Sequence, residues 1–467
     1  MKDANKSPIP STRLLAEFAV QADGFPEAAR ARAVDAITDC VGCMLAGRRE
    51  PLADALLRTL TITPGSAPHA PAMLVGTGYH APASDAALFN GAIAHALDYD
   101  DTNHPAYAHP SAVIVPVLLA AAALRPCTGC DWVDAYILGL EVFGKLGRVL
   151  NTAHYKRGWH ATATFGALAA AIVAGRLLGL DAATMEMAIG IAVSSAGGAR
   201  VNFGSMVKPL HAGLAARNGL QAVMMAANGL ASSTQSLERR YGYFDLFGDT
   251  HADATCFQDL GKPLEILTEY GLALKPYPAC GATHPGIEAA LALHEQLAGA
   301  PIQSVHAGVC EMAFEPLIYV EPKGALQGKF SLHYCLAAAL VDGQVNLATF
   351  SDEKIADPRI LALIPRIHME VDERLRHDSE FATRVAVTTR DGRTLEREVP
   401  LALGKPDRWM SRAQLKRKFD DCCATALAAT RRDSLFDALQ SLDHESGNIA
   451  NLVRYLSGEQ PADEQSS

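Results

Sequence analysis

The segment "LEILTEYGLALKPYP" (residues 264–278) marks a change of sequence pattern that decides the expected fold. Before it, alanine and leucine recur at three- and four-residue spacing in stretches separated by Gly or Pro, which is typical of packed helices. After it, stretches of alternating β-branched residues appear, which are typical of strands. The sequence therefore predicts two structural units of different type.

The strand-rich region contains a clear hairpin signal. Two alternating runs in "TRVAVTTRDGRTLEREVP" (383–400) flank Asp391-Gly392, a dipeptide that suits a type I′ turn because both central residues need positive φ. "SLHYCLAAALVDG" (331–343) has the pattern of a buried helix, and the chain is helical again from Ser411. We therefore expect a mainly α protein. Its large all-helical domain is built from both chain ends, with expected boundaries 1–270 and 401–467. A smaller α+β lid domain is inserted between them at 271–400.

Composition and charge exclude several classes of function. The chain has 467 residues, 49% of them hydrophobic, which is enough for a sizeable core. A formal net charge of -10 with scattered Lys and Arg argues against a nucleic-acid partner. The N-terminal residues lack the apolar run of a secretory signal, and apolar runs elsewhere are shorter than a membrane span. We expect a cytoplasmic protein that binds neither nucleic acid nor membrane.

The ten cysteines form neither a disulfide framework nor a zinc pattern. Cys40 and Cys43 have helical i, i+3 spacing on an apolar face, which favours core packing over metal binding. Cys127 and Cys130 lie on a turn, but no second pair nearby completes four ligands. We expect free thiols, with the second pair in a surface loop.

Familiar catalytic signatures are missing from the sequence. There is no GxGxxG after a strand, no GxxxxGK[ST], no HExxH and no GxSxG. "SMVK" (205–208) matches the SxxK of serine hydrolases, but a pattern with two defined positions arises often by chance and no KTG accompanies it. Nucleotide and flavin cofactors thus lack their usual binding motifs here.

Five separated segments combine His, Lys or Tyr with Gly or Pro: 95–111, 154–166, 200–213, 274–284 and 328–334. Basic groups beside helix breaks are what a carboxylate pocket requires. Lys208 and Lys275 each precede a proline, which disfavours continued helix there and turns the lysine towards a cleft. We expect both lysines in a site for an anionic substrate.

The first segment, "HALDYDDTNHPAYAHPS" (95–111), crowds acids and histidines together. It has neither EF-hand order nor HxxxH spacing, so we do not expect a metal site. On a continuous helix three side chains share one face, namely His95, Asp98 and Thr102. The helix should break near His104-Pro105, which leaves His109 on a loop. His95 also fits a buried, hydrogen-bonded core residue.

These segments together resemble the MmgE/PrpD family. The resemblance rests on "HALDYDDTNHP", "HPSAVIVP", "GWHATATFGALAAA", "KPLHAGLAARNGL", "KPYPACGATHPGIEAAL" and "KFSLHY", which follow in order over nearly the whole chain. That family includes 2-methylcitrate dehydratases, cis-aconitate decarboxylases and iminodisuccinate epimerases. The resemblance implies a homodimeric, cofactor-free lyase or isomerase that acts on a small di- or tricarboxylate, with a helical domain and a lid domain.

The resemblance also implies site residues. In the decarboxylase pattern the positions around the substrate correspond here to Asp98, Thr102, His109, His160, Lys208, Lys275 and Tyr334, with His104 nearby. Where decarboxylases have a histidine five residues after the hinge lysine, this chain has Cys280, and this difference argues against decarboxylation of cis-aconitate. Segments 154–160 and 200–213 look more like the epimerase branch, in which a tyrosine at the position of Tyr155 is a proton carrier.

The expected chemistry needs both cations and proton carriers. Removing a proton next to a carboxylate, or losing CO2, builds negative charge that nearby cations stabilise. We assign the catalytic roles to His109, Tyr155, His160, Lys208 and Lys275, with Lys275 entering when the lid closes. We assign substrate contacts to Asp98, Thr102, His104, Cys280 and Tyr334, and expect Asp98 to orient a histidine. The alternative is a noncatalytic carboxylate-binding or scaffold protein with the same fold.

Overall fold

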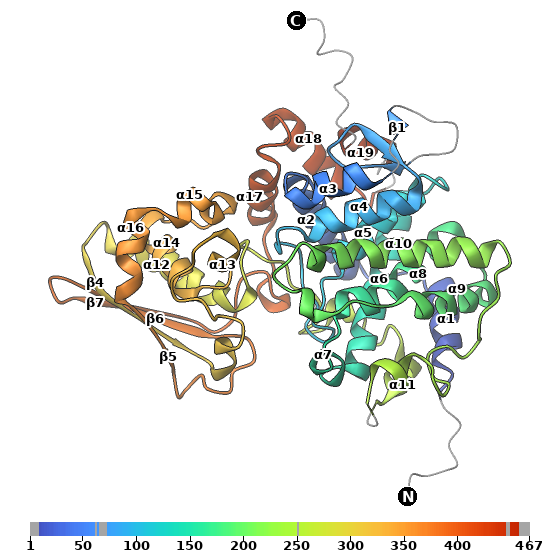
Figure 1. Ribbon diagram of the computed structural model, residues 1–467, viewed down its shortest axis with the longest axis horizontal. Coiled ribbons are helices and arrows are strands. Elements are labelled where there is room, and N and C mark those ends of the chain that lie inside the picture. The colour runs from blue at the N-terminus through green and yellow to red at the C-terminus, as the bar shows by residue number, and fades with distance from the viewer. Residues whose placement is uncertain (1–8, 61–62, 65–71, 250–251, 445–448, 457–467) are drawn as a thin grey trace, which may run out of the picture. The chain divides into compact units, whose positions relative to one another are not determined.

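The chain forms two compact units: Met1–Ala273 with Arg412–Ser467 (unit 1), and Leu274–Ser411 (unit 2). The computed structural model describes residues 9–60, 63–64, 72–249, 252–444 and 449–456. In Figure 1 unit 1 contains helices from both chain ends, whereas the yellow and orange unit 2 combines helices with a sheet. The expected mainly α fold with an inserted α+β part is thereby confirmed. The first residues, on which the expectation of no secretory signal depends, lie outside the described part.

Unit 1 is a bundle of helices with one small sheet. Its longer helices are α1 (Ser11–Gln21), α2 (Glu27–Gly47), α3 (Pro51–Thr59), α4 (Ala83–His95), α5 (Ser111–Ala122), α6 (Gly129–Leu150), α8 (Ala161–Leu178), α9 (Ala182–Ser195), α10 (Val207–Ala227), α17 (Arg412–Cys423), α18 (Ala429–Gln440) and α19 (Ile449–Leu456). The short helices are α7 (Ala153–Lys156) and α11 (Tyr243–Phe247). The sheet, which the expectation of an all-helical domain did not include, has the order β1-β3-β2 and consists of Thr63–Pro64, Tyr79–Ala81 and Ala72–Met73.

Helix α8 lies at the centre of unit 1 and packs against α5, α6, α9 and α10. By length and composition alone it is the one helix of the described chain that would suit a membrane span, with a mean hydropathy of 1.6. Of its residues 89% are buried inside the protein, as is usual for a core helix. Its alanines and glycines allow the neighbouring helices to come close on all sides.

Two glycines allow α4 and α10 to cross at very short distance. A Cβ on Gly91 would lie 2.7 Å from the Cα of Gly213, and a Cβ on Gly213 would lie 2.1 Å from the carbonyl oxygen of Leu88. No side chain fits at either position, so both need glycine. The crossing matters for the site, because Asp98 follows the end of α4 and Lys208 lies at the start of α10.

Unit 2 is built on a four-stranded sheet with the order β5-β4-β6-β7. Its strands are β4 (Ile302–Val309), β5 (Ile367–Val371), β6 (Thr383–Thr389) and β7 (Thr394–Val399). β4 and β5 are parallel, and the other neighbours are antiparallel. Its helices are α12 (His284–Leu297), α13 (Ala325–Gly328), α14 (Leu332–Asp342), α15 (Asp352–Ile355) and α16 (Pro358–Leu363). The buried helix expected at 331–343 is α14, whose apolar residues join the core of unit 2.

The predicted β6–β7 hairpin is present, but its turn is not type I′. The N–H of Thr389 donates to the carbonyl of Arg393 over 2.8 Å, which leaves three residues in the loop. Among the described residues of this loop Gly392 alone has a positive φ, 85°. A three-residue loop with glycine in the left-handed position is the next common hairpin type. The Asp-Gly signal therefore predicted the hairpin correctly and the turn type wrongly.

The cysteines are free, as expected. Cys40 and Cys43 are fully buried in α2, which confirms core packing. Cys127 and Cys130 are half-buried at the start of α6. The indole N–H of Trp132 donates to the Sγ of Cys127 over 3.2 Å, so this pair is more closely packed than a surface loop.

Candidate functional site

Helix α4 ends at His95, earlier than the sequence pattern predicts. Asp98 has a left-handed backbone with φ 54°, which no helix can continue and which Asp adopts more readily than most residues. The predicted helix through Thr102 is therefore wrong, and the chain turns instead. Thr102 forms a bridge with Ala273, with 2.9 Å hydrogen bonds in both directions.

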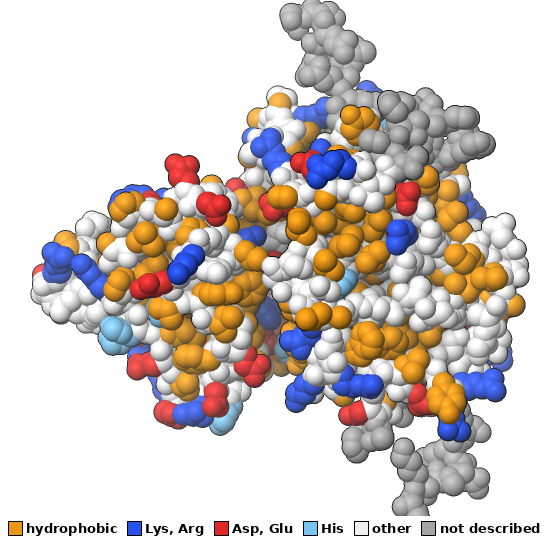
Figure 2. Space-filling view, viewed as in Figure 1, with side chains coloured by type: hydrophobic (Ala, Val, Ile, Leu, Met, Phe, Trp, Pro, Cys, Tyr) orange, Lys and Arg blue, Asp and Glu red, His pale blue; other side chains and the backbone are white. Residues whose placement is uncertain are grey.

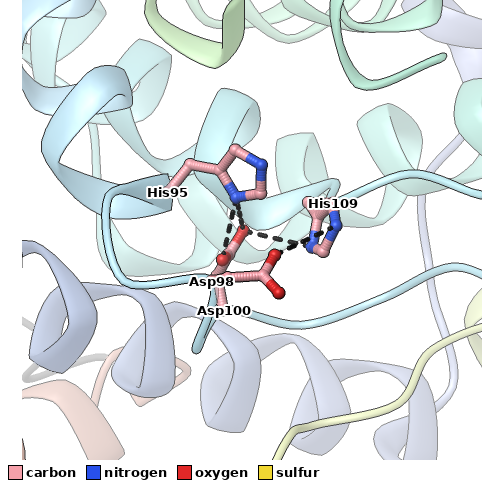
Figure 3. Close-up of side chains that lie close together, drawn as sticks. All are labelled: His95, Asp98, Asp100 and His109. Atoms are coloured by element: carbon pink, nitrogen blue, oxygen red, sulfur yellow. Dashed lines mark hydrogen bonds and ion pairs between the residues drawn. The ribbon is translucent and has the colours of Figure 1, made fainter. Parts of the chain in front are cut away.

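The turn brings four side chains together, as Figure 3 shows for His95, Asp98, Asp100 and His109. The Nδ1 of His95 lies 2.9 Å from both carboxylate oxygens of Asp100, and both side chains are fully buried. The Nδ1–H of His109 donates to the carbonyl of Asp101 over 2.9 Å, and its Nε2 lies 3.7 Å from Asp98. The carboxylate that orients a histidine by a hydrogen bond is thus Asp100, whereas this role was expected of Asp98.

Asp98 has a lysine as its main partner. The Nζ of Lys208 donates to Asp98 Oδ1 over 2.7 Å. Lys208 is the second residue of α10 and Pro209 the third. The expectation that Pro209 ends the helix at Lys208 is wrong, because a proline in the first turn removes no intrahelical hydrogen bond. Lys208 therefore extends from a rigid helix start.

Two neutral histidines lie beside this ion pair. His160 precedes α8, and its Nδ1 lies 3.0 Å from the Nδ1 of His211 in α10. Burial, with His95 and Lys208 nearby, holds the pKa of His160 well below its usual range, and burial also lowers the pKa of His211. One Nδ1 therefore donates a proton to the other. The ring of His95 stacks on His160 at 6.0 Å between centroids.

Tyr155, which was also predicted to carry a proton, packs under an arginine. The guanidinium of Arg200 lies 3.4 Å from the centre of the Tyr155 ring and donates to the Tyr155 carbonyl over 2.8 Å. Phe203, from the same segment, meets the His160 ring edge-on at 4.9 Å. Tyr155 and His160 therefore both contact the segment 200–203, one through Arg200 and one through Phe203.

A buried acid, Asp101, stabilises the loop that follows α4. Asp101 accepts hydrogen bonds from the backbone N–H of Ser111 (3.1 Å), from its hydroxyl (2.5 Å) and from the hydroxyl of Tyr136 (3.2 Å). Burial raises the pKa of Asp101 to about 7. These bonds join the loop to the start of α5 and hold the backbone carbonyl that orients His109.

Four further predicted residues are described by their own surroundings. The ring of His104 packs against Tyr107 and Tyr270, with centroids 5.5 and 5.4 Å away. Three others belong to unit 2: Lys275, Cys280 and Tyr334. Tyr334 is fully buried in the core of that unit and donates its hydroxyl to the carbonyl of Thr349. That these four residues belong to a substrate site stays a prediction.

Several residues of the cluster were not expected from the sequence. Asp100, His211 and Arg200 had no assigned role, and His95 had only been considered as a core residue. The segment "DYDD" (98–101) holds three acids, and the helical periodicity assumed there selected Asp98 alone. The left-handed turn makes Asp100 the histidine partner instead.

One group of side chains has the composition of a metal site: His95, Asp98, Asp100 and His109, whose candidate ligand atoms lie within 4.8 Å of one another. In the structure Lys208 binds Asp98, and the Nδ1 of His95 binds Asp100. A metal ion would have to displace an ammonium group and an imidazole proton. The donor set therefore fits proton transfer better than coordination.

We accordingly expect turnover to survive metal removal. Dialysis against EDTA should leave kcat/KM within about twofold, because protonated Lys208 already balances the charge of Asp98. The measurement is the activity of the dialysed protein, with its metal content checked by mass spectrometry. Loss of activity that a divalent ion restores would contradict this prediction and favour a metal at the four residues.

Two domain models of one protein family match most of the sequence. The MmgE/PrpD N-terminal domain matches residues 13–254, and the MmgE/PrpD C-terminal domain matches residues 277–443. The chain therefore belongs to the MmgE/PrpD family. The C-terminal match includes α17 and α18, which the structure places in unit 1.

Curated relatives carry two kinds of enzyme name. The chain is 28% identical to mouse cis-aconitate decarboxylase, over 83% of this chain and 81% of the relative. It is 27% identical to the cis-aconitate decarboxylase of Aspergillus terreus, with 93% of each chain covered. It is 25% identical to the 2-methylcitrate dehydratase of Cupriavidus necator, over 77% of this chain and 78% of the relative. Its relatives thus act by different reactions.

Proposed function

We propose that this protein is a cofactor-independent lyase or isomerase that transfers protons next to a carboxylate of a small di- or tricarboxylate. The observation that carries the proposal is the Lys208–Asp98 ion pair with His109 and His160 around it. The names of the relatives, a decarboxylase of cis-aconitate and a dehydratase of 2-methylcitrate, support this substrate class.

The residues can divide the work as follows. A histidine takes a proton from the carbon next to a carboxylate; the C–H bond breaks and its electron pair delocalises onto that carboxylate. Lys208 stabilises the charge that grows there. A second proton carrier then decides the outcome. Reprotonation on the other face gives the epimer, and protonation of a leaving hydroxyl gives dehydration. In decarboxylation a C–C bond breaks instead, CO2 leaves, and the electron pair takes the proton.

The test is an NMR assay in D2O with three separate substrates: cis-aconitate, 2-methylcitrate and iminodisuccinate. A new product, or deuterium at the carbon next to a carboxylate, supports the proposal and identifies the reaction. Binding without exchange or product would favour the noncatalytic carboxylate-binding alternative. If the folded protein neither binds nor converts any of the three compounds, both the proposal and its alternative are overturned.

A test of Tyr155 distinguishes an epimerase reaction from dehydration and decarboxylation. If Tyr155 carries a proton, Tyr155→Phe should keep KM and lower kcat by about 10²-fold or more, the usual loss for a general acid or base. Kinetic constants on the substrate found above provide the measurement. Arg200→Lys is the matched variant, since it keeps the charge beside the ring. Unchanged kcat in Tyr155→Phe would mean that Tyr155 only packs under Arg200, and would favour dehydration or decarboxylation.

We also propose a cytoplasmic homodimer. Figure 2 shows hydrophobic side chains gathered over the visible face of unit 1. In and beside α10, large apolar side chains are exposed: Val201 (88%), Met206 (55%), Leu230 (50%) and Met225 (44%). Light scattering should give about twice the monomer mass of 49.6 kDa, and Met225→Glu should shift it towards the monomer. A monomer mass for the unmodified protein would contradict the proposal.

A further inference from the structure

Two fully buried histidines of unit 1 differ in one respect. His154 has a partner for both ring nitrogens: Nδ1 donates to the carbonyl of Phe247 at 3.0 Å, and Nε2 bonds the hydroxyl of Thr164 at 2.8 Å. In His95, Nδ1 is bound by Asp100, but the buried Nε2 has no hydrogen-bond partner within the described chain. A buried polar atom left without a partner costs about 1–3 kcal/mol. Such an atom calls for a functional explanation.

Asp100 determines the state of that nitrogen. An ionised carboxylate only accepts hydrogen bonds, so Nδ1 of His95 donates to Asp100, and in the neutral form of the ring this is its single proton. Nε2 then carries a lone pair. A carboxylate holds a histidine in the same way in catalytic triads, where the histidine acts as a base. The buried Nε2 of His95 is therefore prepared to accept a proton.

Three histidines of the cluster have three different environments. Nδ1 of His109 donates to the carbonyl of Asp101 and lies 3.5 Å from Asp100, while its Nε2 lies 3.7 Å from Asp98, whose carboxylate is already paired with Lys208. Nδ1 of His160 is bound to the neutral His211. His95 has the shorter carboxylate contact on Nδ1, 2.9 Å to Asp100, together with a buried Nε2 that has no partner within the described chain. Its ring lies 4.3 Å from the His109 ring and 6.0 Å from the His160 ring.

We propose that His95 is a further catalytic residue, the base of the reaction, and that Asp100 is its positioning residue. This inference rests on the proposed function and assigns its proton acceptor. The C–H bond next to the substrate carboxylate breaks, the proton moves to Nε2 of His95, and the electron pair stays on the substrate. The imidazolium formed is stabilised by Asp100 until it returns the proton to solvent or product.

The pH dependence of this step involves the titratable and charged groups near the ring. These groups lie on the loop after α4 and at the starts of α8 and α10: Asp98, Asp100, Asp101, His109, His160, Lys208 and His211. Removing the carboxylate of Asp100 takes away the nearest negative charge. The base should then lose its proton more easily, so that the acidic limb of the kcat/KM profile moves to lower pH.

The experiment compares His95→Gln, Asp100→Asn and the control His154→Gln on the substrate found for the unmodified enzyme. His95→Gln should lower kcat by about 10²- to 10⁴-fold with little change in KM. Asp100→Asn should lower kcat less and shift the acidic limb to lower pH. His154→Gln should lower the Tm but leave the acidic limb in place, because both ring nitrogens of His154 are already engaged in hydrogen bonds within the core.

A second measurement uses the unmodified protein and therefore does not depend on whether the variants fold. Spectra of the unmodified protein with 15N-labelled histidine should show His95 with a protonated Nδ1 and an unprotonated Nε2. A proton on Nε2 overturns the inference, as does full turnover in His95→Gln. A loss in Asp100→Asn without a shifted limb overturns the role of Asp100. Absence of turnover in the unmodified enzyme would be a failure of the proposed function, and is thereby distinguished from the failure of this inference.

Discussion

Lys208→Met should lower kcat/KM by about 10³-fold, the scale on which removal of a preorganised charge acts in an active site. Lys208 provides the ammonium group that lies 2.7 Å from Asp98. Without it, the charge that develops on the substrate loses its stabilising cation, and Asp98 keeps a negative charge that repels a carboxylate. The measurement is steady-state kinetics of the purified variant on the identified substrate.

Lys156→Met is the matched control for that experiment. Lys156 is an exposed lysine of α7 in the same unit, so its loss changes the net charge equally. We expect nearly unchanged kinetics for Lys156→Met, because exposed charges are screened by solvent. If Lys208→Met keeps kcat/KM within about threefold, Lys208 is not part of the machinery and the proposed site is wrong.

Lys418→Met should lower the free energy of unfolding by about 3–5 kcal/mol, the usual cost of breaking a buried ion pair by removing one partner. Lys418 lies 2.6 Å from Asp39 and donates to the carbonyl of Tyr99 over 2.8 Å. Both charged side chains are only 2% exposed. Burial raises the pKa of Asp39 to about 6 even with Lys418 beside it. Without that cation the buried carboxylate must either stay charged and unpaired or take up a proton, and both cost free energy. Urea denaturation at pH 7 measures the effect.

A neighbouring lysine provides the control. Lys416 lies on the same helix and pairs with Asp420 and Asp433, but its side chain is 26% exposed. Lys416→Met should therefore cost no more than about 1 kcal/mol. The double variant Asp39→Asn with Lys418→Met should recover part of the loss, since it leaves no unpaired charge. Equal effects of the two lysine variants would contradict the buried-pair explanation.

Lys418 also links stability to the site. It bonds the carbonyl of Tyr99, which lies between Asp98 and Asp100 in the chain. Lys418 comes from α17 in the C-terminal part of the chain, more than 300 residues later. No local pattern in 95–111 indicates this contact. The exact course of the loop thus depends on a side chain that sequence reasoning places in a different helix.

Periodicity was sufficient for the two-part architecture, although it did not indicate the small sheet β1-β3-β2 of unit 1. The change at 264–278 separates a region of 3.6-residue periodicity from one with alternating strands, and the return to helix at Ser411 indicates an insertion. These patterns depend on which face of each element is buried, and each buried face requires an apolar residue at regular, short intervals in the sequence. Local signals were weaker: Asp391-Gly392 predicted the hairpin but not its turn type, since one positive φ at Gly392 was enough.

What the sequence by itself determined is the two-part fold and a set of residue types suited to a carboxylate, among which the structure brings Asp98, His109, His160 and Lys208 into one cluster. Tertiary structure alone decided which acid serves which base. The left-handed turn at Asp98 turns Asp100 towards His95 and leaves Asp98 to Lys208. A left-handed residue is unfavourable in isolation, and here the long-range contacts of Lys208 and Lys418 hold the segment in place, so no periodicity within the segment could have indicated it.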